Sequence, residues 1–200
     1  MYGTFPVQRL MCNVAVSFVS MPLNRLKRGT KWSNVIETRP WEGKSLRRKK
    51  LAVYLDTSVY NRPFDDQDQV RIKLETEAFL SIIDRAVKGG ISIIGSSALS
   101  YENSRNPFVE RRERVLSYLS IAAKWLRLSK SIKGRATALE SAGIDPLDAM
   151  HLACAEAGGA AYFVTCDDAV IRKAKQQKGH LALEVCSPLE FVVKEVFKDA

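Results

Sequence analysis

Short apolar runs alternate with amphipathic stretches from residue 51 to residue 198. Runs rich in Val, Ile and Leu predict buried strands, and apolar residues that recur every three or four positions predict helices between them. The expected strands are 51–55, 91–94, 126–129, 161–165 and 181–185. Strands and helices that alternate along a chain indicate a parallel sheet with helices on both faces. The expected fold class is therefore α/β, a three-layer α/β/α sandwich with a mainly parallel central sheet.

The predicted helices are bounded by residues that stop or cap helices. Gly89-Gly90 ends the first long helix, Asn106-Pro107 breaks the next, and Pro146 stands at a first helical position. The expected long helices cover 69–88, 108–125, 131–142, 147–157, 167–177 and 188–198, with a shorter one around Glu102.

Residues 1–50 lack a clear hydrophobic period. They contain three prolines and end in the basic cluster Arg47-Arg48-Lys49-Lys50. This composition predicts an irregular or disordered basic arm that precedes a domain over residues 51–200. The alternative is a start codon assigned too far upstream, with Met11 or Met21 as later candidates.

The distribution of charge matters more than the net charge of +9. Residues 1–50 hold 11 Lys and Arg against two acids, whereas residues 51–200 hold equal numbers of basic and acidic residues. Inside the domain, residues 105–135 carry nine basic residues against Glu110 and Glu113. This segment predicts a track for a phosphate backbone. The candidate contacts are Arg105, Arg111, Arg112 and Arg114, although each by itself fits a solvated helical face equally well.

Cysteine and histidine usage excludes several classes of site. The four cysteines form no C-x-x-C pair, and two histidines are too few for a histidine-rich metal centre. Buried free thiols are typical of a reducing compartment, so we expect a cytoplasmic protein. No run of 18 apolar residues is present, so we expect no membrane-spanning helix.

Four acids stand at equivalent places in the predicted sheet. Asp56 ends the first strand, Glu102 follows the second, Asp148 lies in a first helical turn, and Asp167 follows the strand 161–165. The carboxyl ends of parallel strands are where ligands bind in open α/β sheets. Four carboxylates at one rim of the sheet outline a metal site.

Each acid also has a purely structural explanation. Asp56 fits the start of a turn, Asp145 with Asp148 resembles a capping box, and Asp167 fits a helix cap. Glu102 judged alone fits a surface helix position, and His151 is more often a core or supporting histidine than a ligand. The joint pattern, rather than any single acid, carries the metal-site hypothesis.

Four motifs in this order resemble the PIN-domain family over residues 51 to about 190. They are Leu-Asp-Thr-Ser (55–58), Ser-x-Leu-Ser-Tyr-Glu-Asn (97–103), Asp-Pro-x-Asp-Ala-x-His-Leu-Ala (145–153) and Phe-Val-Thr-Cys-Asp-Asp (163–168). The resemblance implies a metal-dependent ribonuclease, often the toxin of a bacterial toxin–antitoxin module. It implies an antitoxin protein as partner and a homodimer. The basic arm departs from the family pattern, which usually begins at the first strand.

The resemblance also implies roles for individual residues. Asp56, Glu102, Asp148 and Asp167 would bind Mg²⁺ or Mn²⁺, with supporting hydroxyls from Thr57, Ser58 and Thr165. We assign Asp56 and Asp148 to the main ion, and Asp167 and Glu102 to completing the site or holding a second ion. A-form helices hide their backbone from a narrow acidic cleft, so the RNA is expected to be single-stranded at the cut. The alternative is a non-catalytic RNA- or protein-binding module on the same fold.

Overall fold

The computed structural model describes residues 50–177 and 179–199 of the 200-residue chain. The basic arm predicted for residues 1–50 therefore lies outside the described residues, apart from Lys50. None of the described helices is both long enough and apolar enough to cross a lipid bilayer.

A sheet of parallel strands forms the centre of the described residues, which confirms the predicted fold class. Its five strands are β1 (Leu51–Leu55), β2 (Ile91–Ser96), β3 (Lys124–Leu126), β4 (Tyr162–Val164) and β5 (Glu184–Cys186). Their order in space is β3-β2-β1-β4-β5, and every neighbouring pair is parallel. β1 therefore lies in the middle, and its residues Val53–Leu55 are fully buried. Burial on both faces explains why this strand is continuously apolar.

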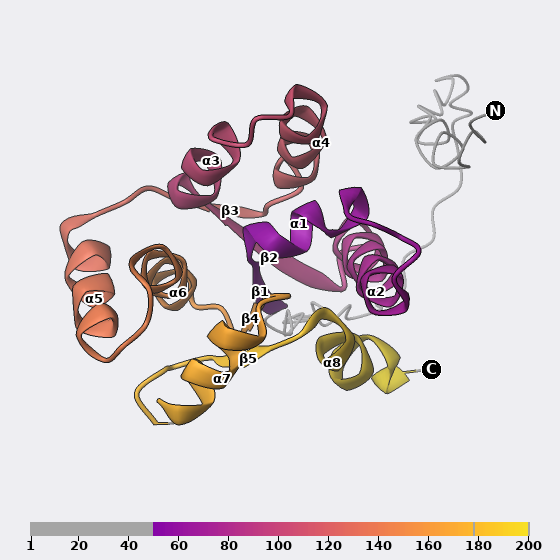
Figure 1. Cartoon of the computed structure of the whole chain (residues 1–200). Coiled ribbons are helices and arrows are strands. Elements are labelled where there is room, and N and C mark those ends of the chain that lie inside the picture. The colour runs from indigo at the N-terminus through magenta and orange to yellow at the C-terminus, as the bar shows by residue number, and fades with distance from the viewer. Residues whose placement is uncertain (1–49, 178, 200) are drawn as a thin grey trace, which may run out of the picture. The chain divides into compact units, whose positions relative to one another are not determined.

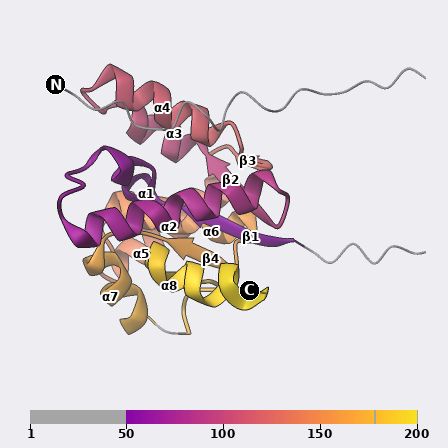
Figure 2. The ribbon, with the colours of Figure 1, turned by 90° about the vertical axis from the view of Figure 1, so that its right-hand side faces the viewer.

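Helices cover both faces of the sheet (Figures 1 and 2). They are α1 (Thr57–Asn61), α2 (Val70–Val87), α3 (Ser97–Ser104), α4 (Val109–Leu119), α5 (Lys130–Ser141), α6 (Pro146–Gly158), α7 (Asp168–Gln176) and α8 (Pro188–Phe191). α2 and α8 lie side by side over one face, and α6, backed by α5, covers the other. A 3-10 turn (Arg62–Phe64) follows α1, and a π turn (Val192–Val196) and a 3-10 turn (Phe197–Asp199) follow α8.

The strand order places a crevice between the carboxyl ends of β1 and β4. The chain leaves β1 toward β2 and β3, then crosses to β4 on the other side of β1. At such a switch point the connecting helices diverge to opposite faces and leave room for a ligand. Leu55 pairs with Val164. The residues after them, Asp56 and Thr165, consequently meet at the edge of the sheet.

Two boundaries in the middle of the chain differ from the sequence-based expectation. The helix predicted to extend to Trp125 ends at Leu119, and the edge strand predicted at 126–129 lies at Lys124–Leu126. The amide of Ala123 donates to the carbonyl of Ile93 over 2.9 Å, which draws the chain into the sheet. Because the chain pairs with β2 from residue 123 onward, the helix ends earlier than its amphipathic pattern predicts.

Other differences concern short elements. The strand predicted at 181–185 spans Glu184–Cys186, and the closing helix is α-helical only over Pro188–Phe191. The helix α1 and the 3-10 turn after it were not predicted. These segments are too short for a hydrophobic period to define them.

Candidate metal centre

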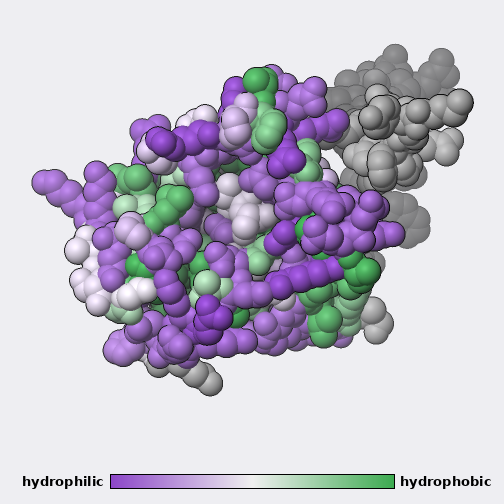
Figure 3. All heavy atoms as spheres, in the orientation of Figure 1, coloured by the Kyte–Doolittle hydropathy of each residue, from purple (hydrophilic) through white to green (hydrophobic). Residues whose placement is uncertain are grey.

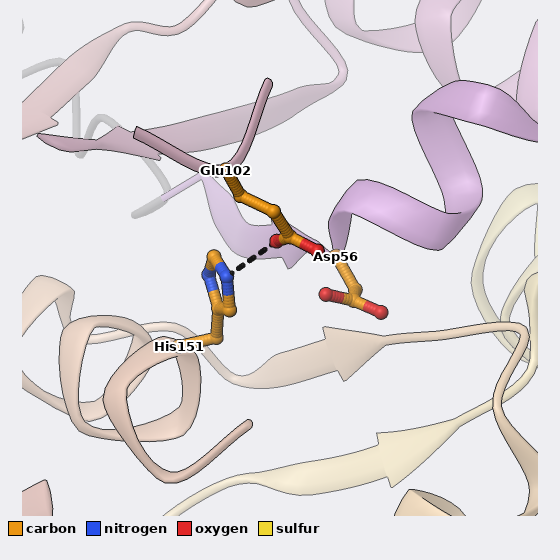
Figure 4. Close-up of side chains that lie close together, drawn as sticks. All are labelled: Asp56, Glu102 and His151. Atoms are coloured by element: carbon orange, nitrogen blue, oxygen red, sulfur yellow. Dashed lines mark hydrogen bonds and ion pairs between the residues drawn. The ribbon is translucent and has the colours of Figure 1, made fainter. Parts of the chain in front are cut away.

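Three side chains come together where β1, α3 and α6 meet. Asp56 follows β1, Glu102 lies in α3, and His151 lies in α6. One oxygen of each carboxylate and one ring nitrogen of His151 all lie within 4.8 Å of one another. Figure 4 shows Glu102 pointing toward both of the other side chains. Asp148 and Asp167 lie outside this compact group.

Hydroxyl groups fix the carboxylate of Asp56. Its Oδ2 atom accepts hydrogen bonds from Ser58 Oγ at 2.6 Å and Thr165 Oγ1 at 2.8 Å. The backbone amide of Asp56 donates to the carbonyl of Val164 at 2.9 Å. The residue is buried. The described residues give its other oxygen, Oδ1, no hydrogen bond. One oxygen is thus held in place while the other is available to a ligand.

Glu102 is held in a similar way from two sides. Its Oε2 atom accepts hydrogen bonds from Thr57 Oγ1 at 2.5 Å and from His151 Nε2 at 2.8 Å. Burial opposes ionisation of this carboxyl, but the hydrogen bonds from His151 and Thr57 outweigh it and lower its pKa. Glu102 is therefore ionised at neutral pH. Its two hydrogen bonds also show that it is not simply a solvated surface residue, as its sequence position alone suggested.

A chain of buried hydrogen bonds supports His151 from behind. Its Nδ1 atom lies 2.8 Å from the hydroxyl of Tyr54, which lies 2.7 Å from Ser96 Oγ. Nε2 donates a hydrogen bond to the carboxylate of Glu102, and in that tautomer Nδ1 accepts a hydrogen bond from the hydroxyl of Tyr54. Burial raises the pKa of Tyr54, so its hydroxyl keeps that proton. Sequence reasoning did not single out Tyr54, although a tyrosine inside a buried strand signals that its hydroxyl needs a partner.

The surroundings of Asp148 disfavour the ionised form of its side chain. Burial raises its pKa to about 6, and the charges of Asp56, Asp167 and Asp145 add to this effect. Asp148 therefore lies near enough to the other acids to be repelled by them. None of the described residues donates a hydrogen bond to it.

The capping-box interpretation of Asp148 does not fit the structure. Asp145 occupies the N-cap position of α6 but its side chain accepts no capping hydrogen bond. It pairs instead with Lys173, with 2.7 Å between Nζ and Oδ2. Asp148 consequently has no local structural partner that accounts for its position.

Asp167 is a helix cap, as its sequence position indicated. Its Oδ1 atom accepts hydrogen bonds from the amides of Ala169 at 2.6 Å and Val170 at 3.4 Å. Its Oδ2 atom receives none from the described residues. The neighbouring Asp168 is exposed and forms two hydrogen bonds of 2.7 Å with Arg71. Of the two adjacent acids, Asp167 is the one whose charge acts on Asp148.

The four candidate RNA-binding arginines divide into two groups. Arg111 donates to the carbonyl of Phe64 at 2.7 Å, and Arg112 donates to the carbonyl of Asn106 at 2.6 Å. Arg112 thus helps to hold the α3–α4 connection, whereas Arg111 ties α4 to the 3-10 turn after α1. Arg105 and Arg114 are exposed. An RNA-binding role for all four stays a prediction.

The donor set fits a hard divalent cation. Asp56, Glu102, Asp148 and Asp167 each keep at least one carboxylate oxygen without a hydrogen bond from the described residues. The opposite oxygens of three of them are oriented by hydroxyl, imidazole or amide groups. Carboxylate oxygens supported in this way are the ligands that Mg²⁺ and Mn²⁺ prefer. A cation also removes the repulsion that raises the pKa of Asp148.

Comparisons with known proteins match one family and several solved structures, among them two of low sequence identity. The PIN domain family model matches residues 53–176. None of the curated proteins matches the chain. The crystal structure of VapBC2 from Rickettsia felis bound to a promoter DNA fragment is 18% identical, with 68% of this chain and 98% of that chain covered and a TM-score of 0.47. DNA-bound VapBC from Salmonella typhimurium is 16% identical, with 69% and 98% covered and a TM-score of 0.41.

Proposed function

The chain belongs to the PIN domain family, and from that premise we propose that it is a metal-dependent endoribonuclease. Members of this family are generally metal-dependent nucleases. The observation that carries the proposal is the set of oriented carboxylates at the switch point of the sheet. Asp56 and Glu102 lie close together with His151, next to buried hydroxyls. Burial raises the pKa of Asp148, and the charges of Asp56 and Asp167 add to this effect. Such an arrangement is costly unless a cation completes it.

The residues of the centre have distinct roles in this proposal. Asp56 and Asp148 hold the main ion, and Asp167 and Glu102 complete the site or hold a second ion. Ser58 and Thr165 orient Asp56 through hydrogen bonds. When bound, Mg²⁺ or Mn²⁺ supplies Lewis-acid chemistry, which acidifies an attacking water and neutralises charge on the phosphoryl oxygens. No side chain is needed as a covalent nucleophile, because water attacks the phosphorus directly.

His151 and Thr57 act on Glu102 rather than on the substrate. Their hydrogen bonds keep Glu102 ionised and fix the direction of its carboxylate. We assign His151 to this supporting role because both of its ring nitrogens already have partners. A histidine held from both sides is poorly placed to exchange protons with solvent or RNA.

We further propose a toxin role, because the sequence motifs resemble those of PIN-domain toxins. It brings with it an antitoxin protein as partner and a homodimer. The cytoplasmic location rests on the cysteine usage and also stays a prediction. The proposed substrate is RNA that is unpaired where it is cut, because an A-form helix hides its backbone from a narrow acidic site.

Substitution of Asp56 by Asn tests the nuclease proposal. The amide keeps the shape of the side chain but removes the charge that a cation needs. We expect RNA cleavage in Mg²⁺ or Mn²⁺ to fall by about 10²–10³-fold, as for loss of one electrostatic contact to a transition state, and EDTA to abolish it in the wild-type protein. Labelled RNA incubated with each variant gives the rates, and circular dichroism checks the fold.

The matched control is Asp168→Asn, which removes an exposed acid that Arg71 already neutralises. It should keep its cleavage rate. Full activity of Asp56→Asn would contradict the assignment. A wild-type protein that binds RNA but does not cleave it in any divalent metal would favour the non-catalytic binding module instead.

A further inference from the structure

Two large aromatic side chains on the α3–α4 hairpin are exposed. Tyr101 is 57% exposed in α3, and Phe108 is 58% exposed just before α4. A guanidinium group lies over each ring: Arg105 is 5.7 Å from the centroid of Tyr101, and Arg111 is 4.9 Å from that of Phe108. Arg105 also donates a hydrogen bond to the Tyr101 hydroxyl at 3.2 Å. The rings are thereby held at the surface rather than in the core.

Hydrogen bonds place this hairpin beside the metal centre. Asn106 donates to Asn61 Oδ1 at 3.2 Å, which ties the α3–α4 connection to the end of α1. Arg111 reaches the carbonyl of Phe64 one turn further along. Tyr101 directly precedes Glu102, which is itself bonded to the first residue of α1. The two exposed rings therefore lie on a hairpin that is hydrogen-bonded to α1, the helix that begins directly after Asp56.

We propose that Tyr101 and Phe108, together with Arg105 and Arg111, form a platform on which unpaired bases of single-stranded RNA stack next to the metal centre. This inference rests on the proposed ribonuclease function. Every nucleobase has a flat π face that stacks on an aromatic ring or a guanidinium plane, and the arginines also attract the flanking phosphates. The platform selects unpaired RNA, because bases inside a duplex cannot present their faces.

The charge of this surface favours RNA over a protein partner. The cores of protein interfaces are depleted of charge, whereas here a guanidinium lies over each exposed ring. The two acids of α4, Glu110 and Glu113, line a hollow with Arg114 and Ser117, and Glu113 also lines a second hollow between α3 and α4; neither hollow includes Tyr101 or Phe108. Figure 3 shows small hydrophobic patches over α3 and α4 enclosed by hydrophilic side chains.

The test measures the affinity of the full chain for a short unstructured RNA in EDTA, where cleavage is absent. Tyr101→Leu and Phe108→Leu keep apolar volume but lose the π face, so we expect each to raise the dissociation constant about tenfold, the loss typical of one stacked base. Tyr101→Trp should preserve the affinity. The control is Phe197→Leu, which changes an equally exposed ring (59%) on the C-terminal 3-10 turn and should have no effect. Fluorescence anisotropy of labelled RNA gives the dissociation constants of the wild-type protein and of the four variants.

Unchanged affinity in both leucine variants overturns the platform, and so does an equal loss in Phe197→Leu. Rings that serve to dock a partner protein would also leave the RNA affinity unchanged. Cleavage in Mn²⁺ separates the two proposals. A wild-type protein that cleaves RNA while the leucine variants keep full affinity refutes the platform alone. RNA binding that depends on the rings in a protein that never cleaves refutes the ribonuclease alone.

Discussion

Glu102 and Asp148 are both assigned to the proposed metal centre, but their pKa values move in opposite directions. Glu102 is desolvated, yet hydrogen bonds from His151 and Thr57 favour its charged form and lower its pKa. Asp148 is desolvated without such donors and is repelled by neighbouring acids, so its pKa rises to about 6. The number of hydrogen-bond donors, rather than the burial, decides the sign. Glu102 is already ionised and can bind a cation, whereas the ionised form of Asp148 would be stabilised by a bound cation.

Asp148→Asn should stabilise the metal-free protein at neutral pH. The folded-state pKa of about 6 lies above the ordinary aspartate value of 3.8, so an ionised Asp148 opposes folding. This penalty is full above pH about 6 and disappears as the pH falls below the unfolded value. Because the side chain is half exposed, we expect a gain of about 1 kcal/mol, or roughly 3 °C in Tm. Thermal unfolding in EDTA across this pH range measures it.

Asp148→Asn should also lose cation binding and RNA cleavage. Asp145→Asn, which removes an exposed acid paired with Lys173, is the control. A structural role for Asp148 in capping α6 predicts the opposite sign, with Asn less stable than Asp at neutral pH. That outcome would remove Asp148 from the metal centre.

At the scale of elements, the junction between β1 and α1 builds most of the centre. Asp56 is the N-cap of α1, and the next two residues donate to Glu102 and to Asp56 itself. The motif Leu-Asp-Thr-Ser located this junction, but α1 was not predicted because a five-residue helix has too few positions to show a period. The helix matters because it directs the hydroxyls of Thr57 and Ser58 to different carboxylates.

Tyr54→Phe tests whether β1 supports Glu102 through α6. The change removes the hydroxyl that bridges Ser96 and His151 but keeps the ring that stacks on Phe163. We expect a loss of about 1 kcal/mol in the free energy of unfolding. Mn²⁺ affinity should fall by about tenfold, since partners behind a metal ligand tune its affinity. Denaturant unfolding and Mn²⁺ titration give the two values.

Tyr60→Phe provides the matched control. Tyr60 is also fully buried, but its hydroxyl has no hydrogen-bond partner among the described residues. Its removal should leave the Mn²⁺ affinity unchanged and the fold as stable as before or more so. If Tyr54→Phe binds Mn²⁺ as tightly as Tyr60→Phe does, the hydrogen-bond chain has no influence on Glu102.

At the scale of the whole molecule, the centre joins segments that lie far apart in the chain. Thr165 and Asp56 are 109 residues apart, and His151 and Glu102 are 49 apart. A cation bound here therefore links β1, β4, α3 and α6 in the folded state only. Residues 51–200 carry no net formal charge, so the group of acids is a local feature rather than part of an acidic segment.

Mn²⁺ should accordingly raise the melting temperature. A ligand that binds only the native state at 100 times its dissociation constant adds about 2.7 kcal/mol, which corresponds to roughly 5–10 °C for a domain of this size. Scanning calorimetry with and without Mn²⁺ measures the shift, and Asp56→Asn should abolish it. A shift of equal size in that variant would place the cation elsewhere.

Much of the architecture was predictable because it follows from local patterns. The alternation of apolar runs and amphipathic stretches predicted the parallel α/β sheet, and the fold and the PIN-domain resemblance are both confirmed. The edge strands were misplaced by a few residues. Their positions depend on pairing with a neighbour, as the bond from Ala123 to Ile93 shows, and a local pattern contains no information about that pairing.

The sequence by itself determined that acids follow the strands, and parallel strands necessarily bring their carboxyl ends to one edge. Only the tertiary structure decided how these acids differ. It gave Glu102 two donors and Asp148 none, placed Asp167 as a helix cap, and brought the unpredicted Tyr54 behind His151. The physical reason is that ionisation and orientation depend on burial and on partners many residues away, which only the packing of β1, α3 and α6 brings together.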